Sequence, residues 1–217
     1  MLDLLLPQRC AVCGSPGPQV CDPCLEALPH IEPPLCDRCG APTAWPVRRC
    51  RECAGRRLAF ARARAAVAYD ERVRALVGSW KERGLRRLVV PAAELVVSAI
   101  ETPRADVLAF VPADVDRGLR RGHHPAEALA RELALRWRLP LAPLLSRPRA
   151  VRPQRGLTLA ERRRNVAGAF RAAESPRRVV LVDDVYTTGA TANAAASALR
   201  AAGARRVEIV TLARAVR

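Results

Sequence analysis

The sequence contains very little lysine, few aromatic side chains and no long apolar run. Lys81 is the only lysine among 37 basic residues, and aromatic residues make up 4% of the 217 residues. The N-terminal apolar candidate, Leu2–Leu6, stops at Pro7, whereas a membrane-spanning helix needs about 20 apolar residues. No basic region precedes it. We therefore expect no secretory leader, no membrane insertion and a cytoplasmic location.

The charge of the chain is strongly unbalanced. Lys and Arg number 37 against 21 Asp and Glu, which gives a formal net charge of +16. Such an excess attracts polyanions, whether nucleic acid or a polyphosphate ligand, and charge alone does not choose between them. Half of the residues are hydrophobic. This content excludes a disordered chain and is enough for a folded domain with a small second module.

All cysteines lie in the first quarter of the chain, as four CxxC pairs. They are Cys10, Cys13, Cys21, Cys24, Cys36, Cys39, Cys50 and Cys53. The surrounding segment is punctuated by proline and glycine and has almost no periodic apolar pattern, so burial alone cannot fold it. Tetrahedral zinc held by four thiolates can, because each CxxC turn offers two sulfurs. We predict two structural zinc ions within a module of residues 1–58.

The spacing leaves the grouping of the cysteines open. Read in order, the first four cysteines make one site and the last four the other, but an interleaved arrangement has compatible spacing. Disulfides or redox-active CxxC pairs are the alternative to zinc. Four repeats of the motif and a reducing cytoplasm favour metal.

Residues 59–217 alternate between strand-like and helix-like stretches. The expected strands are 62–69, 107–111, 141–145, 178–182 and 207–212, and the expected helices are 71–82, 88–100, 126–137 and 191–202. Alternation of this kind predicts an α/β domain with a mainly parallel sheet and flanking helices. Ligands of such sheets bind at the carboxyl ends of the strands.

The stretch VVLVDDVYTTGAT, residues 179–191, carries the clearest chemistry. Four apolar residues predict a buried strand, with Asp183 and Asp184 at its carboxyl end. The loop that follows, which opens a helix, consists of Thr187, Thr188, Gly189, Ala190 and Thr191. Small residues let backbone N–H groups approach an anion, and the helix dipole favours phosphate there. Carboxylates beside such a loop suit hydroxyl groups or magnesium, so the stretch fits a ribose 5-phosphate.

These thirteen residues resemble the phosphoribosyl-diphosphate-binding signature of the type I phosphoribosyltransferases. The resemblance implies that Asp183 and Asp184 hold the ribose hydroxyls and act in catalysis, while residues 187–191 bind the 5-phosphate. It also implies magnesium, bound with phosphoribosyl diphosphate. In this reaction pyrophosphate leaves C1 of the sugar as an acceptor nitrogen approaches, so carboxylates favour the growing ribose charge and cations favour the leaving group.

With its four CxxC pairs, the chain as a whole resembles the ComF family of competence-associated proteins, which join a double zinc ribbon to a phosphoribosyltransferase-like domain. Further matching stretches are WKERG at 80–84, Arg120–Gly122 and the block 154–170. The family resemblance implies a role in natural competence and DNA uptake, with single-stranded DNA or a helicase of the competence machinery as a partner.

The loop after strand 107–111 is where this fold binds pyrophosphate, and here it supplies Arg117, Arg120 and Arg121. A solvated basic turn is the alternative. The loop departs from the family pattern, because acids stand at Asp114 and Asp116 and the 123–125 stretch reads HisHisPro. The two histidines suit either a base for the acceptor or an exposed turn.

Two further basic features have two interpretations each. Residues 147–164 carry seven arginines and one acid, which suits either a hood over the substrate or a track for single-stranded DNA without aromatic stacking. Lys81 is either a ligand-facing ammonium or a chance survivor. Two functional hypotheses follow. One is a phosphoribosyltransferase with an acceptor that the sequence does not identify, and the other is a non-catalytic sensor that binds a phosphoribosyl ligand.

Overall fold

The computed structural model describes residues 8–113, 123–147 and 168–216. Its helices are α1 (Asp22–Glu26), α2 (Glu71–Lys81), the 3-10 turn η2 (Arg86–Leu88), α3 (Val89–Ala99), α5 (Pro125–Trp137) and α7 (Ala190–Ala201). Its strands are β1 (Arg62–Ala68), β2 (Val107–Phe110), β3 (Leu145–Ser146), β4 (Arg171–Ala172), β5 (Arg178–Tyr186) and β6 (Arg206–Arg214). None of the helices in these ranges has the length and apolar character needed to cross a bilayer.

Four strands form one parallel sheet in the order β1-β6-β5-β2. The central strands β5 and β6 are rich in Val, Ile and Leu and are buried on both faces, which is the pattern expected of a parallel sheet covered by helices. The short strands β3 and β4 pair separately and antiparallel. The predicted α/β class with a mainly parallel sheet is confirmed.

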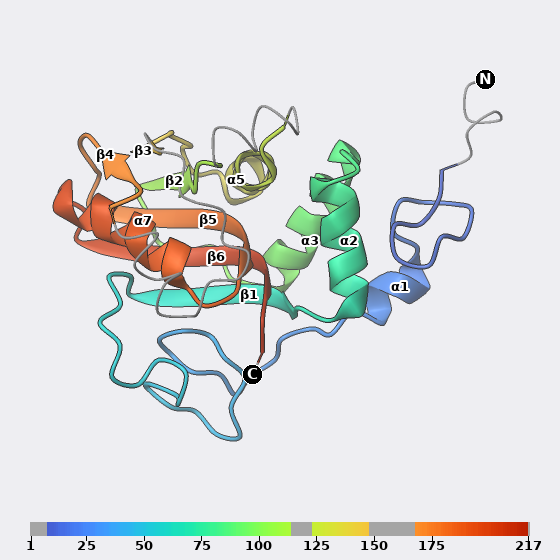
Figure 1. Cartoon of the computed structure of the whole chain (residues 1–217), viewed down its shortest axis with the longest axis horizontal. Helices are drawn as coiled ribbons and strands as arrows, with labels where there is room; N and C mark the ends of the chain where they lie inside the picture. Colours follow the sequence, from blue (N-terminus) through green and yellow to red (C-terminus); the bar gives the residue numbers. More distant parts are fainter. Residues whose placement is uncertain (1–7, 114–122, 148–167, 217) are drawn as a thin grey trace.

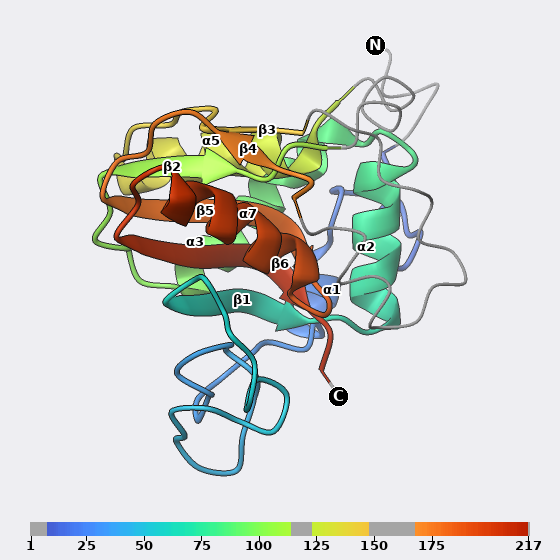
Figure 2. The same ribbon diagram turned by 60° about the vertical axis from the view of Figure 1, so that its left-hand side comes forward.

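Helices cover both faces of this sheet. On one face, α3 and α5 pack with α2 over side chains such as Val180, Val182 and Leu212. On the opposite face, α7 packs through its alanines and Leu199 over Leu181 and Ile209 (Figures 1 and 2). The sheet therefore separates two hydrophobic cores, and the loop between β5 and α7 lies where the chain enters the second core.

The cysteine-rich segment is divided between these two cores. Val20 and Leu28 join the core of α2, α3 and α5, whereas Cys36, Cys39 and Cys53 join the core of α7. Figure 1 shows the earlier part beside α1 and α2 and the later part below β1. The two halves of the segment are thus attached to different faces of the same sheet.

The outer edge of β1 is covered by the same segment. Ile31 N donates to Ala66 O at 3.0 Å, and Ala68 N donates to Pro29 O at 2.8 Å. At the other end of the strand, Ala63 N donates to the carbonyl of Arg38 at 2.9 Å. These hydrogen bonds occupy backbone groups on the side of β1 that faces away from β6.

Two strand predictions need correction. The expected strand 141–145 is wrong, since only a single bridge forms at Leu141 and a two-residue strand begins at Leu145. Pro140 and Pro143 explain this, because neither can donate to a ladder. The strand expected at 178–182 continues to Tyr186, because β6 keeps pairing with it through Thr211, Ala213 and Arg214.

Candidate functional site

The acidic pair lies on β5 just beyond the end of its neighbour β2. The last pair in that ladder joins Phe110 and Val182, so Asp183 and Asp184 follow where β5 has lost its neighbour on that side. Both side chains are half-buried. The sequence placed them at the end of the strand; the structure places them inside β5 but at the open end of the sheet, where ligands of parallel sheets bind.

Lys81, the last residue of α2, forms an ion pair with this acidic pair. Its Nζ lies 2.6 Å from Asp184 Oδ2, with side-chain exposures of 20% and 16%. A short ion pair shielded from water interacts more strongly than a surface pair. The structure thus brings together residues about one hundred positions apart, and the single lysine of the sequence faces the candidate site.

Asp183 carries the strongest electrostatic perturbation in the site. Burial and the neighbouring Asp184 carboxylate raise the pKa of Asp183 to about 7, against the opposing effects of Lys81 and Arg147. Two adjacent carboxylates in a poorly solvated place cannot both ionise easily. Asp183 Oδ1 also accepts a hydrogen bond from Asp184 N at 2.9 Å.

A cavity of about 290 Å³ opens beside these residues. Its charged lining consists of the acidic pair, Lys81 and Arg147, and His124 and Thr191 lie at its edge. The guanidinium of Arg147 stacks 5.5 Å from the centre of the Phe170 ring. The lining of the cavity therefore combines carboxylates with cationic side chains, as a ligand with both hydroxyl groups and phosphates requires. The sequence indicates Arg147 only as one of the seven arginines in residues 147–164.

The 187–191 loop follows the acidic pair and opens α7. Gly189 is the N-cap, with φ of 70°, a left-handed conformation that favours glycine. Thr188 Oγ1 accepts from Ala190 N at 3.2 Å, while the other first-turn N–H groups of a helix have no acceptor within the helix. A narrow pocket of about 20 Å³ is lined by Thr187, Gly189 and their neighbours. The loop has the geometry of an anion cradle.

Tyr186 supports this loop from below, a contact that nothing in the sequence indicates. A Cβ on Gly189 would lie 2.2 Å from Tyr186 Oη, so the hydroxyl is directly beneath the glycine. Tyr186 is 5% exposed, and its hydroxyl has no hydrogen-bond partner among the described residues. Burial raises the pKa of Tyr186 to about 12. The hydroxyl is therefore a protonated donor without an acceptor in the part of the chain that the structure describes.

The cysteines form two tetrads in sequence order. Cys10, Cys13, Cys21 and Cys24 make the first tetrad, and Cys36, Cys39, Cys50 and Cys53 make the second tetrad. Within each, the sulfur atoms lie within 4.8 Å of one another, and all eight cysteines are free thiols. Four thiolates at such separations fit one tetrahedral zinc ion per tetrad. The interleaved grouping and disulfides are thereby ruled out.

Other predicted residues fall outside the description. Arg117, Arg120 and Arg121, proposed for pyrophosphate, lie outside the described residues, as do Asp114 and Asp116. The arginines of the predicted hood are also outside, except Arg147. Of the two histidines, His124 borders the cavity, whereas His123 Nε2 contacts the carbonyl of Trp80 at 2.9 Å.

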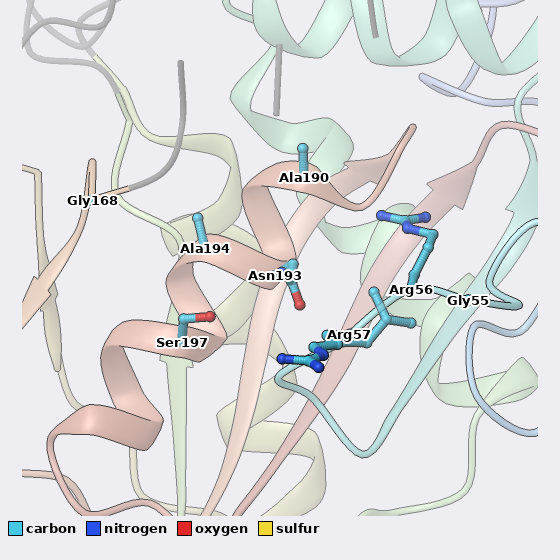
Figure 3. Close-up of a pocket in the computed structure, with 9 residues that line it drawn as sticks. Gly55, Arg56, Arg57, Gly168, Ala190, Asn193, Ala194 and Ser197 are labelled. Atoms are coloured by element: carbon cyan, nitrogen blue, oxygen red, sulfur yellow. The ribbon is translucent and has the colours of Figure 1, made fainter. Parts of the chain in front are cut away.

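A larger cavity of about 420 Å³ lies on the other side of the loop (Figure 3). Arg56 and Arg57, which follow the second tetrad, line it opposite Asn193 and Ser197 of α7. Ala190 borders both this cavity and the narrow pocket at the loop. The segment leaving the second tetrad thus meets the beginning of α7.

Two family models match separate parts of the chain. Residues 1–54 match the family model of the double zinc ribbon domain, and residues 119–216 match that of the phosphoribosyl transferase domain. Competence protein F of Haemophilus influenzae is 29% identical over 209 residues, covering 90% of each chain. The DNA utilization protein YhgH of Salmonella typhi is 28% identical over 229 residues, covering 97% of this chain and 99% of that protein.

The sequence similarity extends over almost the whole length of these relatives. The YhgH protein of Escherichia coli (strain K12) is 27% identical over 229 residues, again covering 97% of this chain and 99% of the relative. The two domain matches occur in the order that the tetrads and the parallel sheet show. The chain therefore belongs to the ComF family, in which a double zinc ribbon precedes a phosphoribosyltransferase-like domain.

Proposed function

We propose that this protein binds phosphoribosyl diphosphate with its magnesium ion and transfers the phosphoribosyl group to a nitrogenous acceptor, in the context of competence and DNA utilization that its relatives' names describe. The observation that carries the proposal is the juxtaposition of Asp183, Asp184 and the 187–191 loop at the open end of the parallel sheet. We call residues 187–191 the phosphate loop from here on.

The geometry supports a division of labour within this site. The half-buried carboxylates of Asp183 and Asp184 can accept hydrogen bonds from ribose hydroxyls and stabilise positive charge that develops on the sugar. The N–H groups of the phosphate loop suit the 5-phosphate. Arg147 faces the same cavity and suits the negative leaving group. Bound together with the diphosphate of the ligand, magnesium would neutralise part of its negative charge.

Titration calorimetry and a pyrophosphate-release assay test this proposal. Purified protein with magnesium is expected to bind phosphoribosyl diphosphate, and Asp184→Asn is expected to weaken binding by roughly tenfold or more, since a buried charged hydrogen bond contributes about 1.5–3 kcal/mol. Glu174→Gln, a change at an exposed acid, is the matched control. Sustained release of pyrophosphate with one of a panel of bases supports transfer. Absence of binding would refute the proposal.

A non-catalytic sensor is the second candidate, and Lys81 favours it. Its ammonium already pairs with Asp184 at 2.6 Å, so the ligand must displace or share this ion pair. Tight binding of phosphoribosyl diphosphate without turnover of any base would support the sensor. Turnover would exclude it.

The pH dependence of binding provides a separate prediction. Ribose hydroxyls bind best to an ionised carboxylate, and the pKa of Asp183 is raised to about 7. Affinity is therefore expected to rise several-fold between pH 6 and pH 8, as Asp183 loses its proton. The rise should disappear in Asp183→Asn, and a rise that persists in this variant would contradict the assignment.

We also propose that the double zinc ribbon binds single-stranded DNA. Trp45 is 68% exposed on the stretch between Cys39 and Cys50, whereas Trp80 and Trp137 are buried. Arg48, Arg49 and Arg51, close to it in sequence, are exposed as well. Proteins that bind single strands combine aromatic side chains, on which bases stack, with cations that neutralise the nucleic-acid backbone. The sequence alone predicts a track without such stacking.

Tryptophan fluorescence tests this interface, because Trp45 is the exposed member of the three. Addition of oligo(dT) is expected to quench the emission, and binding is expected to weaken steeply with salt. Trp45→Ala should reduce affinity by roughly fivefold or more, since stacking contributes about 1–3 kcal/mol per base. Leu135→Ala removes another highly exposed apolar side chain and is the control. Equal affinities for both variants would argue against the interface.

We further propose residues 1–58 and 59–217 as the two functional units.

Eight thiols that hold zinc require a reducing environment, which favours the cytoplasm as the location.

A further inference from the structure

We propose that the second tetrad shapes the phosphate loop through Arg56 and Arg214, so that metal at this tetrad governs ligand affinity while metal at the first tetrad does not. This inference concerns the regulation of the phosphoribosyl diphosphate site and rests on the function proposed above. It is carried by three connections between the two regions.

Arg56 makes the first connection. It lies three residues after Cys53, and its Nη2 donates to Thr188 O in the phosphate loop at 2.8 Å. Figure 3 shows its side chain extending toward the beginning of α7. The backbone of Arg56 is itself held to the tetrad segment, because its N–H donates to Cys53 O at 3.2 Å and its carbonyl accepts from Arg49 Nη1 at 3.0 Å. The position of this guanidinium therefore depends on the fold around Cys53.

Arg214 makes the second connection from the end of β6. It is 1% exposed, and its Nη1 donates to Cys39 O at 2.5 Å. Its Nη2 pairs with Glu52 Oε2 at 2.8 Å. The guanidinium lies 5.3 Å from the centre of the Tyr186 ring, the ring whose hydroxyl lies beneath Gly189. Arg214 thus joins two residues of the tetrad segment to the support of the phosphate loop.

A third connection reaches the first turns of α7. Ala59 N donates to Asn193 Oδ1 at 2.7 Å, and Asn193 N closes the helix onto Gly189 O at 2.9 Å. The exit of the second tetrad is therefore hydrogen-bonded to the helix that the phosphate loop begins. A disordered second tetrad would lose all three connections together.

Among the described residues, the first tetrad has no such connection to the phosphate loop. Its neighbours Val12, Val20 and Leu25 pack into the core on the opposite face of the sheet. Within the ranges that the structure describes, no hydrogen bond or ion pair joins residues 8–28 to residues 186–193. The two tetrads thus provide a matched comparison within one chain.

Arg56→Ala and Arg57→Ala form the first test. Both remove one positive charge from the same cavity, but only Arg56 bonds to the phosphate loop. Because Arg56→Ala removes a hydrogen bond from a charged donor to the phosphate loop, it is expected to weaken binding of phosphoribosyl diphosphate roughly tenfold. It should also speed amide hydrogen exchange of residues 187–192 in the ligand-free protein. Arg57→Ala should change exchange little. Equal exchange in the two variants would overturn the proposal.

Cys50→Ser and Cys21→Ser form the second test, one in each tetrad. Each variant is expected to lose one zinc per chain, yet only Cys50→Ser should speed exchange at 187–192 and weaken the ligand. Equal loosening of the loop in both would contradict the proposal. If Cys50→Ser does not fold, the Arg56 pair still decides. The exchange measurements need no ligand, so a failure to bind phosphoribosyl diphosphate would refute the proposed function without deciding this inference.

Discussion

Gly189→Ala is expected to abolish measurable binding of phosphoribosyl diphosphate. The new Cβ would lie 2.2 Å from Oη and 2.4 Å from Cζ of Tyr186, and the residue would keep a φ of +70° that disfavours side chains. The tyrosine cannot easily move, because Arg214 covers its face and Phe60 meets it edge-on at 6.3 Å between ring centres. The phosphate loop must therefore shift, which moves its N–H groups away from the positions in which they can bind a phosphate.

The same substitution should lower the free energy of unfolding by about 1–3 kcal/mol, the usual cost of overpacking and of an unfavourable φ. Titration calorimetry and thermal unfolding measure the two effects. Gly78→Ala is the matched control, because this helical glycine has no atom within 4 Å of the added methyl group and alanine favours helix by about 1 kcal/mol. Affinity of Gly189→Ala within twofold of the parent would show that the loop does not hold the ligand.

Removal of zinc is expected to have the largest effect on stability. We expect about two zinc ions per chain by metal analysis, one for each tetrad. Buried Cys36, Cys39 and Cys53 belong to the core shared with α7, so without metal their thiols lose their cross-link and this part of the core loosens. A loss of about 4 kcal/mol would lower Tm by roughly 10 °C in a chain of this size.

Calorimetry with and without a strong chelator measures this shift, and added zinc should restore the original Tm. Magnesium added instead of zinc is the control, since hard cations prefer oxygen ligands to thiolates. One zinc per chain, or an unchanged Tm after complete removal, would contradict the assignment of two structural sites.

The sequence was sufficient for features that are encoded locally. The parallel sheet followed from alternating patterns, and the acidic pair and the phosphate loop are contiguous, so strand, turn and helix bring them together without help from distant residues. The four CxxC pairs likewise indicated zinc. Their grouping into two tetrads required the fold, because each tetrad is closed by long loops whose paths the spacing leaves open.

Contacts between distant segments were beyond the sequence. The bond from Arg56 to Thr188 spans 132 positions, and among so many arginines nothing marks Arg56 as different from Arg57. Arg214 offered a weak signal, since it is a charged residue at the end of the largely apolar stretch 209–213. The expected strand 141–145 did not form, because Pro140 and Pro143 cannot donate to a strand ladder.

The hydrogen bonds along the outer side of β1 have a consequence for the phosphoribosyltransferase-like domain when it is produced alone. If residues 1–57 were removed, the amide of Ala63 and the carbonyl of Ala66 would lose the partners they have in the whole chain. A sheet edge with unpaired backbone N–H and C=O groups is a template for pairing with a second copy of the chain. The truncated protein should therefore self-associate or precipitate. The cysteine-rich segment thus protects the outer edge of β1 from pairing with other copies of the chain.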